Sequence, residues 1–366
     1  MKHYELPSNA GEVTIEWLNH ALRSDSSGLV LDSNITSFSF DVLGEGKGFM
    51  NQVVRLKLQI GQGASSSDLT LVAKFPSQDP EIQALNDRAG EGQRENMFYQ
   101  DIGGNTDMPT PTLYFSGFDA ATGNSILIIE DLAQARPGDS VAGCSLDDVD
   151  LAIRCLADFQ AKWWNDSGVA QYAWLPQKNE DASFYAREYD RSWNILMNKS
   201  QGMMPDRLWV FGQNLGQYIG TIRRYLSGSP TTLVHGDYRP DNCFFGNHQD
   251  QRPLTIFDWE YCTEGRGVYD VATFLCEALT TKERAEYEID FLVLYHSLLV
   301  DKGITGYSFD QCLIDYRWAY LDLTVFWAVT GGPCDWTSSR AKQYLDNTLE
   351  RIDAALYDNE CAKLIL

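Results

Sequence analysis

A short polar segment between two apolar runs contains the residues best suited to chemistry. It has the sequence HGDYRPDN over residues 235–242, and a further carboxylate, Asp258, follows the apolar residues 254–257. Phosphoryl transfer requires a carboxylate that orients and deprotonates a hydroxyl, and oxygen ligands that hold Mg²⁺ against the phosphates. Asp237 and Asn242 have the H-x-D-x-x-x-x-N spacing that is typical of kinase catalytic loops. The segment therefore predicts a phosphotransferase.

Each residue of this segment has an expected role. Asp237 should orient the acceptor hydroxyl and accept its proton, while Asn242 and Asp258 should ligate Mg²⁺, because hard oxygen ligands suit a hard cation. Alternatively Asp237 and Asn242 are ordinary turn residues, which the joint spacing, the apolar flanks and the downstream Asp258 disfavour. His235 is predicted to hold the loop rather than act as a base. Arg239 is either a phosphate contact or a surface arginine.

Three alternating glycines, Gly44, Gly46 and Gly48, lie between two predicted strands at 35–42 and 51–60. Without side chains, such a loop lets backbone N–H groups approach phosphate oxygens. The alternative is a glycine-rich hairpin with no ligand. The chain has no G-x-x-x-x-G-K-[ST] segment and no strand–G-x-G-x-x-G–helix unit, which excludes a Walker-type NTPase and a dinucleotide-binding dehydrogenase.

Lys74 is a lone cation on the otherwise apolar strand 69–75. A buried lysine needs a partner, because an unpaired buried charge is costly. Glu95, on a predicted helix, is the candidate, and the ion pair would aim Lys74 at the α and β phosphates. The alternatives are a solvent-exposed edge lysine, and a solvated helix face on which Glu91 competes with Glu95.

The pattern of elements predicts an α+β chain with two lobes. Strands at 35–42, 51–60 and 69–75, a hairpin at 112–118 and 125–130, and helices at 13–22 and 81–101 describe a small antiparallel lobe with one main helix. Ser145 begins an S-x-x-D capping pattern for a helix that runs through Trp164. Further helices are expected at 181–200, 206–227, 268–301, 308–330 and 336–357. The predicted domains are therefore 1–130, a linker at 131–145, and 146–366.

The segments LVHGDYRPDNCFF (233–245) and LTIFDWEYCTEGRGVYDVATFL (254–275) resemble the aminoglycoside phosphotransferase and choline-kinase superfamily. Within it, the chain is most similar to the bacterial phosphotransferase and ecdysteroid-kinase-like branch, where GRGVYD follows the metal-binding Asp-Trp. The strong match covers about residues 231–276, and weaker matches extend over most of the chain. The resemblance implies a bilobal protein-kinase-like fold and ATP-dependent phosphorylation of a small-molecule hydroxyl.

The same resemblance implies positions for further residues. Adenine would bind the backbone between Glu130 and Leu132, although a core strand and linker would have the same sequence. Asp241 would be a loop residue outside the chemistry, and Gln160 stands where relatives often carry histidine. Asp270, at an expected helix start, should cap that helix or brace the catalytic loop.

Composition limits the partners and the compartment. The 366 residues are 44% hydrophobic and carry a net charge of −22, which argues against binding nucleic acid or an anionic membrane. The acidity either steers a cationic acceptor or only confers solubility. Eight scattered cysteines without C-x-x-C, together with no apparent leader or transmembrane stretch, predict a cytoplasmic protein with buried thiols at Cys243, Cys276 and Cys312. Five histidines without metal-ligand spacing argue against a zinc enzyme.

The sequence therefore predicts an ATP- and Mg²⁺-dependent kinase for a metabolite, an aminoglycoside-like compound or a lipophilic alcohol. A protein kinase is disfavoured, because the Asp-Phe-Gly motif is missing: Asp258 is followed by Trp259, and no Ala-Pro-Glu segment occurs. A catalytically silent nucleotide-binding regulator is opposed by the intact set of Lys74, Asp237 and both predicted metal ligands. Aromatic residues in 316–336 either line the acceptor pocket or pack in the core. The acceptor, the choice of ATP or GTP, and the oligomeric state are left open.

Overall fold

The computed structural model describes residues 5–23, 33–44, 51–61, 67–200, 202–247 and 252–365. The chain divides into two compact units, Met1–Gln134 and Ala135–Leu366, hereafter the N-terminal and C-terminal units. The division falls within the predicted linker at 131–145. Two of the three glycines predicted to bind phosphate, Gly46 and Gly48, lie outside the described residues.

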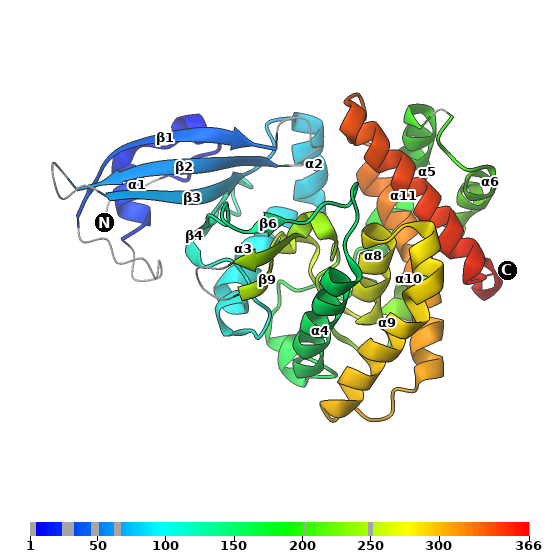
Figure 1. The fold of residues 1–366 in the computed structure, drawn as a ribbon. Coiled ribbons are helices and arrows are strands. Elements are labelled where there is room, and N and C mark those ends of the chain that lie inside the picture. Colours follow the sequence, from blue (N-terminus) through cyan, green and yellow to red (C-terminus); the bar gives the residue numbers. More distant parts are fainter. Residues whose placement is uncertain are drawn as a thin grey trace. The chain divides into compact units, whose positions relative to one another are not determined.

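The N-terminal unit is built on a five-stranded antiparallel sheet in the order β1-β2-β3-β5-β4 (Figure 1). On β2, Val54, Leu56 and Leu58 are buried and alternate with more exposed residues, as a sheet with one covered face requires. Helix α1 supplies Trp17 and Leu18 to the same core. The elements are α1 (Ile15–Ala21), β1 (Ile35–Leu43), β2 (Gln52–Ile60), β3 (Ser67–Phe75), β4 (Leu113–Phe118) and β5 (Ser125–Glu130).

The prediction of a single helix at 81–101 is wrong, because two helices occupy this range. They are α2 (Pro80–Ala89) and α3 (Glu91–Asp101), and Gly90 between them has φ of 71°. That left-handed conformation ends a helix and is accessible to glycine without a Cβ clash. Helix α3 begins afresh and buries the face that carries Glu95.

The C-terminal unit is mostly helical. Helix α8 lies at its centre: all of its residues are buried, and α4, α9, α10 and α11 pack against it (Figure 1). The helices are α4 (Leu146–Lys162), α5 (Ala182–Lys199), α6 (Asp206–Leu215), α7 (Ile219–Leu226), α8 (Val268–Ala278), α9 (Thr281–Asp301), α10 (Phe309–Gly331) and α11 (Ser339–Asp358). The strands are β6 (Arg136–Pro137), β7 (Thr232–Val234), β8 (Cys243–Asn247), β9 (Arg252–Ile256) and β10 (Thr263–Gly265).

Capping residues set several of these helix boundaries. Ser145 caps α4 with a capping box to Asp148, as predicted, although the helix ends at Lys162 rather than at Trp164. The helix predicted at 268–301 is divided in two, because Thr280 and Glu283 form a second capping box that begins α9. The helix predicted at 206–227 is likewise interrupted, by a 3₁₀ turn at Gly216–Tyr218. A capping box and a 3₁₀ turn thus divide segments whose apolar pattern is continuous in the sequence.

The cysteines occupy buried and partly buried positions. All eight cysteines, which lie within the described residues, are free thiols, and Cys243, Cys276 and Cys312 are buried as predicted. Among the helices in the described ranges, none has both the length and the apolar character needed to cross a bilayer.

Candidate active site

The predicted catalytic loop connects β7 to β8 in the C-terminal unit. Its second residue, Gly236, has φ of +86°, and a Cβ there would lie 2.2 Å from the carbonyl oxygen of Tyr261. Only glycine fits this position without moving the backbone of the following segment. The close approach packs the loop directly against the chain that follows Asp258.

Asp237 and Asn242 are brought together at the end of this loop. The Asn242 side-chain Nδ2 donates hydrogen bonds to both the backbone oxygen and Oδ2 of Asp237, each at 2.9 Å. Both residues are buried, with 6% and 3% of their surface exposed. Because Nδ2 uses both hydrogens on Asp237, the Asn242 Oδ1 atom is the one that can face a cation.

Asp258 reaches the same loop through the β8–β9 hairpin. Cys243 pairs with Ile256, and the Phe257 N–H donates to the Asn242 carbonyl oxygen at 3.1 Å. The backbone of Asp258 is therefore held beside Asn242, sixteen positions away in sequence. Asp258 has φ of 68° and ψ of 61°, a left-handed conformation that is uncommon outside glycine, asparagine and aspartate. Carboxylate and amide oxygens are the donors that Mg²⁺ prefers, so this pair fits the predicted ion.

Asp270 braces the loop from α8. Its Oδ2 accepts from the His235 N–H at 2.8 Å, and its Oδ1 accepts from the Gly236 N–H at 3.0 Å. Burial raises the pKa of Asp270 to about 7, although both of these hydrogen bonds lower it. No side chain caps the N-terminus of α8 at Gly267. Of the two predicted roles, bracing is confirmed and helix capping is wrong.

Gln160 on α4 is a site residue that sequence reasoning undervalued. It is completely buried, and its Nε2 donates to Asp270 Oδ2 at 3.1 Å and to the Gly267 carbonyl oxygen at 3.0 Å. Its Oε1 accepts from the Tyr295 hydroxyl at 2.6 Å. The amide therefore fixes the orientation of the brace. A glutamine on the apolar face of α4 was the available signal, because a buried amide needs partners.

His235 has the contacts expected of a scaffold. Its Nδ1 accepts from the Asp237 N–H at 3.2 Å, and its Nε2 lies 3.0 Å from the Phe257 carbonyl oxygen. The ring packs on Trp259 with centroids 4.4 Å apart. Burial lowers the pKa of His235, and a neutral ring protonated on Nε2 satisfies both contacts. His235 thus links the loop to the segment that carries Asp258.

Arg239 faces inward, although its side chain retains 22% exposure. Its Nε donates to Asp237 Oδ2 at 2.9 Å, and its Nη1 donates to the Tyr344 hydroxyl. Asp241, predicted to be a loop residue, accepts from the Ser140 N–H at 3.2 Å. Neither alternative predicted for Arg239 included this contact with Asp237.

The N-terminal unit holds the residues predicted to bind nucleotide. Lys74 Nζ lies 2.7 Å from Glu95 Oε2, and the side chains are 18% and 4% exposed. The ion pair predicted between Lys74 and Glu95 is therefore present in the structure. Gly44, at the end of β1, has φ of 74°, a conformation that favours glycine.

The two carboxylates of the segment predicted to bind adenine are paired within the N-terminal unit. Glu130 Oε2 accepts from the N–H and the hydroxyl of Thr112, both at 3.1 Å, and Arg55 Nε donates to Asp131 Oδ2 at 2.7 Å. Leu132 is buried.

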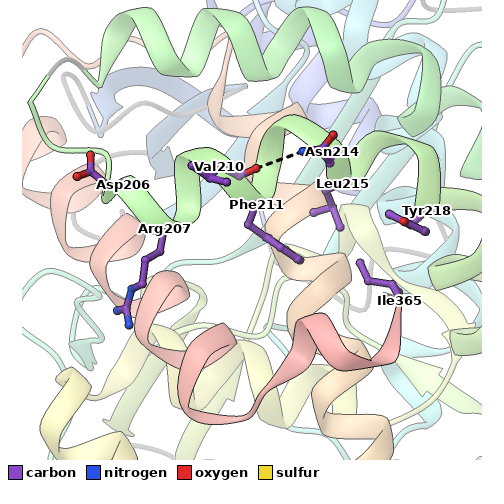
Figure 2. Close-up of a pocket in the computed structure, with 8 residues that line it drawn as sticks. All are labelled: Asp206, Arg207, Val210, Phe211, Asn214, Leu215, Tyr218 and Ile365. Carbon is purple, nitrogen blue, oxygen red and sulfur yellow. Dashed lines mark hydrogen bonds between the residues drawn. The ribbon is translucent and has the colours of Figure 1, made fainter.

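A separate hollow of about 560 Å³ lies on α6 near the end of the chain (Figure 2). Apolar side chains, including Phe211, Leu215 and Ile365, form most of its wall. Arg207 beside it is paired with Asp353 at 2.5 Å. None of the predicted site residues lines this hollow, so it is distinct from the candidate active site.

Comparison with known proteins supports the predicted superfamily. Residues 145–307 match the phosphotransferase enzyme family, a range that contains the catalytic loop, Asp258 and Asp270. A solved GDP complex of an aminoglycoside 2′-phosphotransferase is 17% identical, with a TM-score of 0.51, and the match covers 90% of this chain and 95% of the other. A choline kinase from Cryptosporidium parvum is 11% identical, with a TM-score of 0.53, covering 96% and 95% of the two chains.

These findings confirm the resemblance to the aminoglycoside phosphotransferase and choline-kinase superfamily. The predicted α+β fold, with a small antiparallel part and a larger helical part, is confirmed as well. A probable acyl-CoA dehydrogenase from Arabidopsis thaliana is 23% identical over 226 residues, which are 59% of this chain and 25% of the plant protein. The chain thus spans about a quarter of the length of that relative.

Proposed function

We propose that this protein is an ATP- and Mg²⁺-dependent phosphotransferase that phosphorylates a hydroxyl group of a small molecule. The observation that carries the proposal is the buried catalytic loop, in which Asn242 donates two hydrogen bonds to Asp237 and the Asp258 backbone lies beside Asn242. A carboxylate held next to two oxygen ligands is what phosphoryl transfer requires.

In this proposal Asp237 acts on the acceptor. Its carboxylate orients the hydroxyl and takes the proton as the hydroxyl oxygen forms a bond to the γ-phosphorus and the bond to the leaving ADP oxygen breaks. Asn242 Oδ1 and the Asp258 carboxylate would hold Mg²⁺, which when bound neutralises phosphate charge. His235, Asp270 and Gln160 keep the loop in one conformation.

The nucleotide is assigned to the N-terminal unit. Lys74, held by Glu95 at 2.7 Å, would contact the α and β phosphates. Gly44, Gly46 and Gly48 would cover the phosphates with backbone N–H groups, and adenine would bind the backbone between Glu130 and Leu132. Because the aminoglycoside phosphotransferase named above was solved with GDP, GTP is to be tested beside ATP.

The acceptor is assigned to the C-terminal unit after Asp270, because the groups of the N-terminal unit are committed to the nucleotide. The aromatic stretch 316–336 divides into two parts. Tyr316 is buried and shares its hydroxyl with Glu288 at 3.1 Å and Tyr320 at 2.7 Å, so that end is core. Trp327 and Trp336 instead pack around Tyr344, which contacts Arg239. We assign the acceptor wall to this second part.

The test is a panel of aminoglycosides, amino alcohols, hydroxy acids and lipophilic alcohols, each assayed for ADP or GDP release with mass spectrometry of the product. A gain of one phosphoryl group on an acceptor supports the proposal, and Asp237→Asn is the control for contaminating kinases. Tight MgATP binding without transfer to any acceptor or to water would instead favour the silent nucleotide-binding regulator. Transfer to protein substrates alone would favour a protein kinase.

A further inference from the structure

Helix α11 contacts the loop 235–242 through a hydrogen bond of Tyr344 and through an ion pair of Arg340 with Asp241 at 3.8 Å. Arg239 Nη1 donates to the hydroxyl of Tyr344, in the second turn of α11, while Arg239 Nε donates to Asp237 Oδ2 at 2.9 Å. The guanidinium is a planar, rigid group, so fixing one edge determines where the other edge points. Tyr344 therefore controls the direction from which Arg239 approaches Asp237.

The position of α11 is itself fixed by polar contacts along one face. Arg340 donates to both carboxylate oxygens of Asp139, at 3.1 and 2.9 Å. Three turns later, Arg351 Nη1 donates to the carbonyl oxygens of Ser140 and Glu277, both at 2.8 Å. Residues at this spacing share a helix face with Tyr344. The hydroxyl of Tyr344 thus stands on a helix anchored on both sides of it.

Packing also fixes the ring of Tyr344. Its centroid lies 5.3 Å from that of Trp327 and 6.4 Å from that of Trp336, and the Arg239 guanidinium carbon lies 5.7 Å from it. Burial raises the pKa of Tyr344 well above its usual value, so the hydroxyl stays neutral. A neutral hydroxyl accepts a hydrogen bond from Arg239 without competing with Asp237 for the positive charge.

A second carboxylate makes this restraint necessary. Asp241 Oδ2 lies 3.9 Å from Arg239 Nη1, so the guanidinium has an alternative partner in the same loop. Burial lowers the pKa of Arg239, but attraction by the carboxylates of Asp237 and Asp241 outweighs it and raises this pKa well above its usual value. The hydrogen bond to Tyr344 favours the orientation in which Arg239 keeps its Nε on Asp237, with Asp241 at the longer distance.

The two carboxylate oxygens of Asp237 have different hydrogen-bond environments. Arg239 and Asn242 both donate to Oδ2, each at 2.9 Å, and within the described part of the chain Oδ1 accepts no hydrogen bond. We propose that Tyr344 is a positioning residue for phosphoryl transfer: by holding Arg239 on Asp237 Oδ2, it leaves Oδ1 aimed at the acceptor hydroxyl. The inference rests on the proposed function, and it makes α11 part of the catalytic machinery.

The test compares four variants. Tyr344→Phe removes the hydroxyl and keeps the ring between the tryptophans. Arg239→Lys keeps the charge but replaces the rigid planar fork with a single ammonium nitrogen, and a third variant combines both changes. The matched control is Tyr357→Phe, because Tyr357 lies on the same helix with its ring 4.2 Å from the Arg207 guanidinium carbon but is 65% exposed. All four are first compared with wild type by thermal unfolding.

Turnover is measured as ADP release from MgATP, with the acceptor identified in the panel and with water alone. We expect kcat to fall roughly tenfold in Tyr344→Phe, the scale of one hydrogen bond to a charged group. The KM of Tyr344→Phe for ATP should equal that of the wild type, and the activity of the control Tyr357→Phe should not change. The double variant should be no slower than Arg239→Lys, because Tyr344 acts through Arg239. Wild-type kcat in Tyr344→Phe, or additive losses in the double variant, overturns the proposal.

A measurement without turnover separates this inference from the proposed function. In protein labelled with ¹⁵N-arginine, the Arg239 Nε–H signal is assigned by its loss in Arg239→Lys, and its exchange with solvent is followed by NMR. We expect slow exchange in wild type and in Tyr357→Phe, and at least roughly tenfold faster exchange in Tyr344→Phe. Unchanged exchange in Tyr344→Phe overturns the positioning role even if an acceptor is found. Faster exchange in a protein that phosphorylates nothing refutes the proposed function alone.

Discussion

The two units position their predicted site residues by different means. In the C-terminal unit, the loop 235–242 forms hydrogen bonds with Asp270 on α8, Tyr344 on α11 and Phe257 after β9. Gln160 on α4 acts one step further away, because it donates to Asp270. In the described part of the N-terminal unit, Lys74 is oriented by its ion pair with Glu95. A preorganised carboxylate favours the chemical step, whereas a charge pair next to phosphates favours binding. Variants in the two units should therefore affect different kinetic constants.

The largest effect is expected for Asp237. Replacing it with asparagine removes the proton acceptor and should lower kcat by at least about a hundredfold, which is the scale of general-base losses. The affinity for MgATP should stay close to that of the wild type, because no nucleotide contact is assigned to Asp237. Steady-state turnover and calorimetry measure the two quantities. Near-wild-type turnover in Asp237→Asn would remove the residue from its assigned role.

A smaller effect separates metal binding from bracing within the C-terminal unit. Asp258→Ala should weaken Mg²⁺-dependent ATP binding about thirtyfold, because a ligand carboxylate is lost. Asp270→Ala should preserve the Mg²⁺ dependence and instead lower the free energy of unfolding by about 2 kcal/mol, because two buried N–H groups lose their acceptor. Calorimetry with and without Mg²⁺, and urea unfolding, test the two halves. Equal losses of Mg²⁺-dependent binding would show that the ligand is misassigned.

The N-terminal unit is tested through its ion pair. Lys74→Met should weaken ATP binding about tenfold, or about 1.4 kcal/mol, while kcat at saturating ATP changes less than in Asp237→Asn. Glu95→Gln should lose part of the same affinity, and the double variant should be no weaker than Lys74→Met, because Glu95 acts through Lys74. Additive losses would mean that Glu95 has an independent role. Glu91→Gln, one turn earlier on α3, is the control.

The smallest effect concerns a buried carboxyl near the catalytic loop. Glu277 is 1% exposed, both of its carboxylate oxygens lack hydrogen-bond partners among the described residues, and burial raises its pKa to about 7. The folded state therefore binds this proton more tightly than the unfolded state, and stability falls as pH rises from about 4.5 towards 7 and above.

Glu277→Gln should remove this pH dependence. Relative to wild type, the variant should gain on the order of 1 kcal/mol in unfolding free energy between pH 5.5 and pH 8. Urea unfolding at both pH values measures it, with the exposed Glu286→Gln as the control. An equal stability difference at the two pH values would mean that Glu277 does not ionise in this range.

Local patterns in the sequence were sufficient for several features. Asp237 and Asn242 are five positions apart in a short loop between two strands. Such a loop has few possible conformations, so their spacing in sequence was enough to predict that they lie close together. Ser145 and Asp148 predicted a capping box that depends only on residues three apart. The pairing of Lys74 with Glu95 followed from the cost of an unpaired charge on an apolar strand.

Two helix boundaries were predicted wrongly, because apolar periodicity and the local backbone preferences of single residues compete there. Apolar periodicity continues through 81–101 and 268–301, but the left-handed Gly90 and the cap at Thr280 each end one helix and begin another. Periodicity reports which face is buried, and it is insensitive to a single residue that changes backbone direction.

By itself, the sequence determined the class of fold, and it predicted the segment 235–242 as the catalytic loop and the residue types that could bind Mg²⁺. Only the tertiary structure decided how Asp237 is held. Gln160 lies 110 positions from Asp270, and Tyr344 lies 105 positions from Arg239, so no spacing relates these pairs. Such contacts arise when helices pack and bury polar atoms that must then find partners wherever the fold provides them.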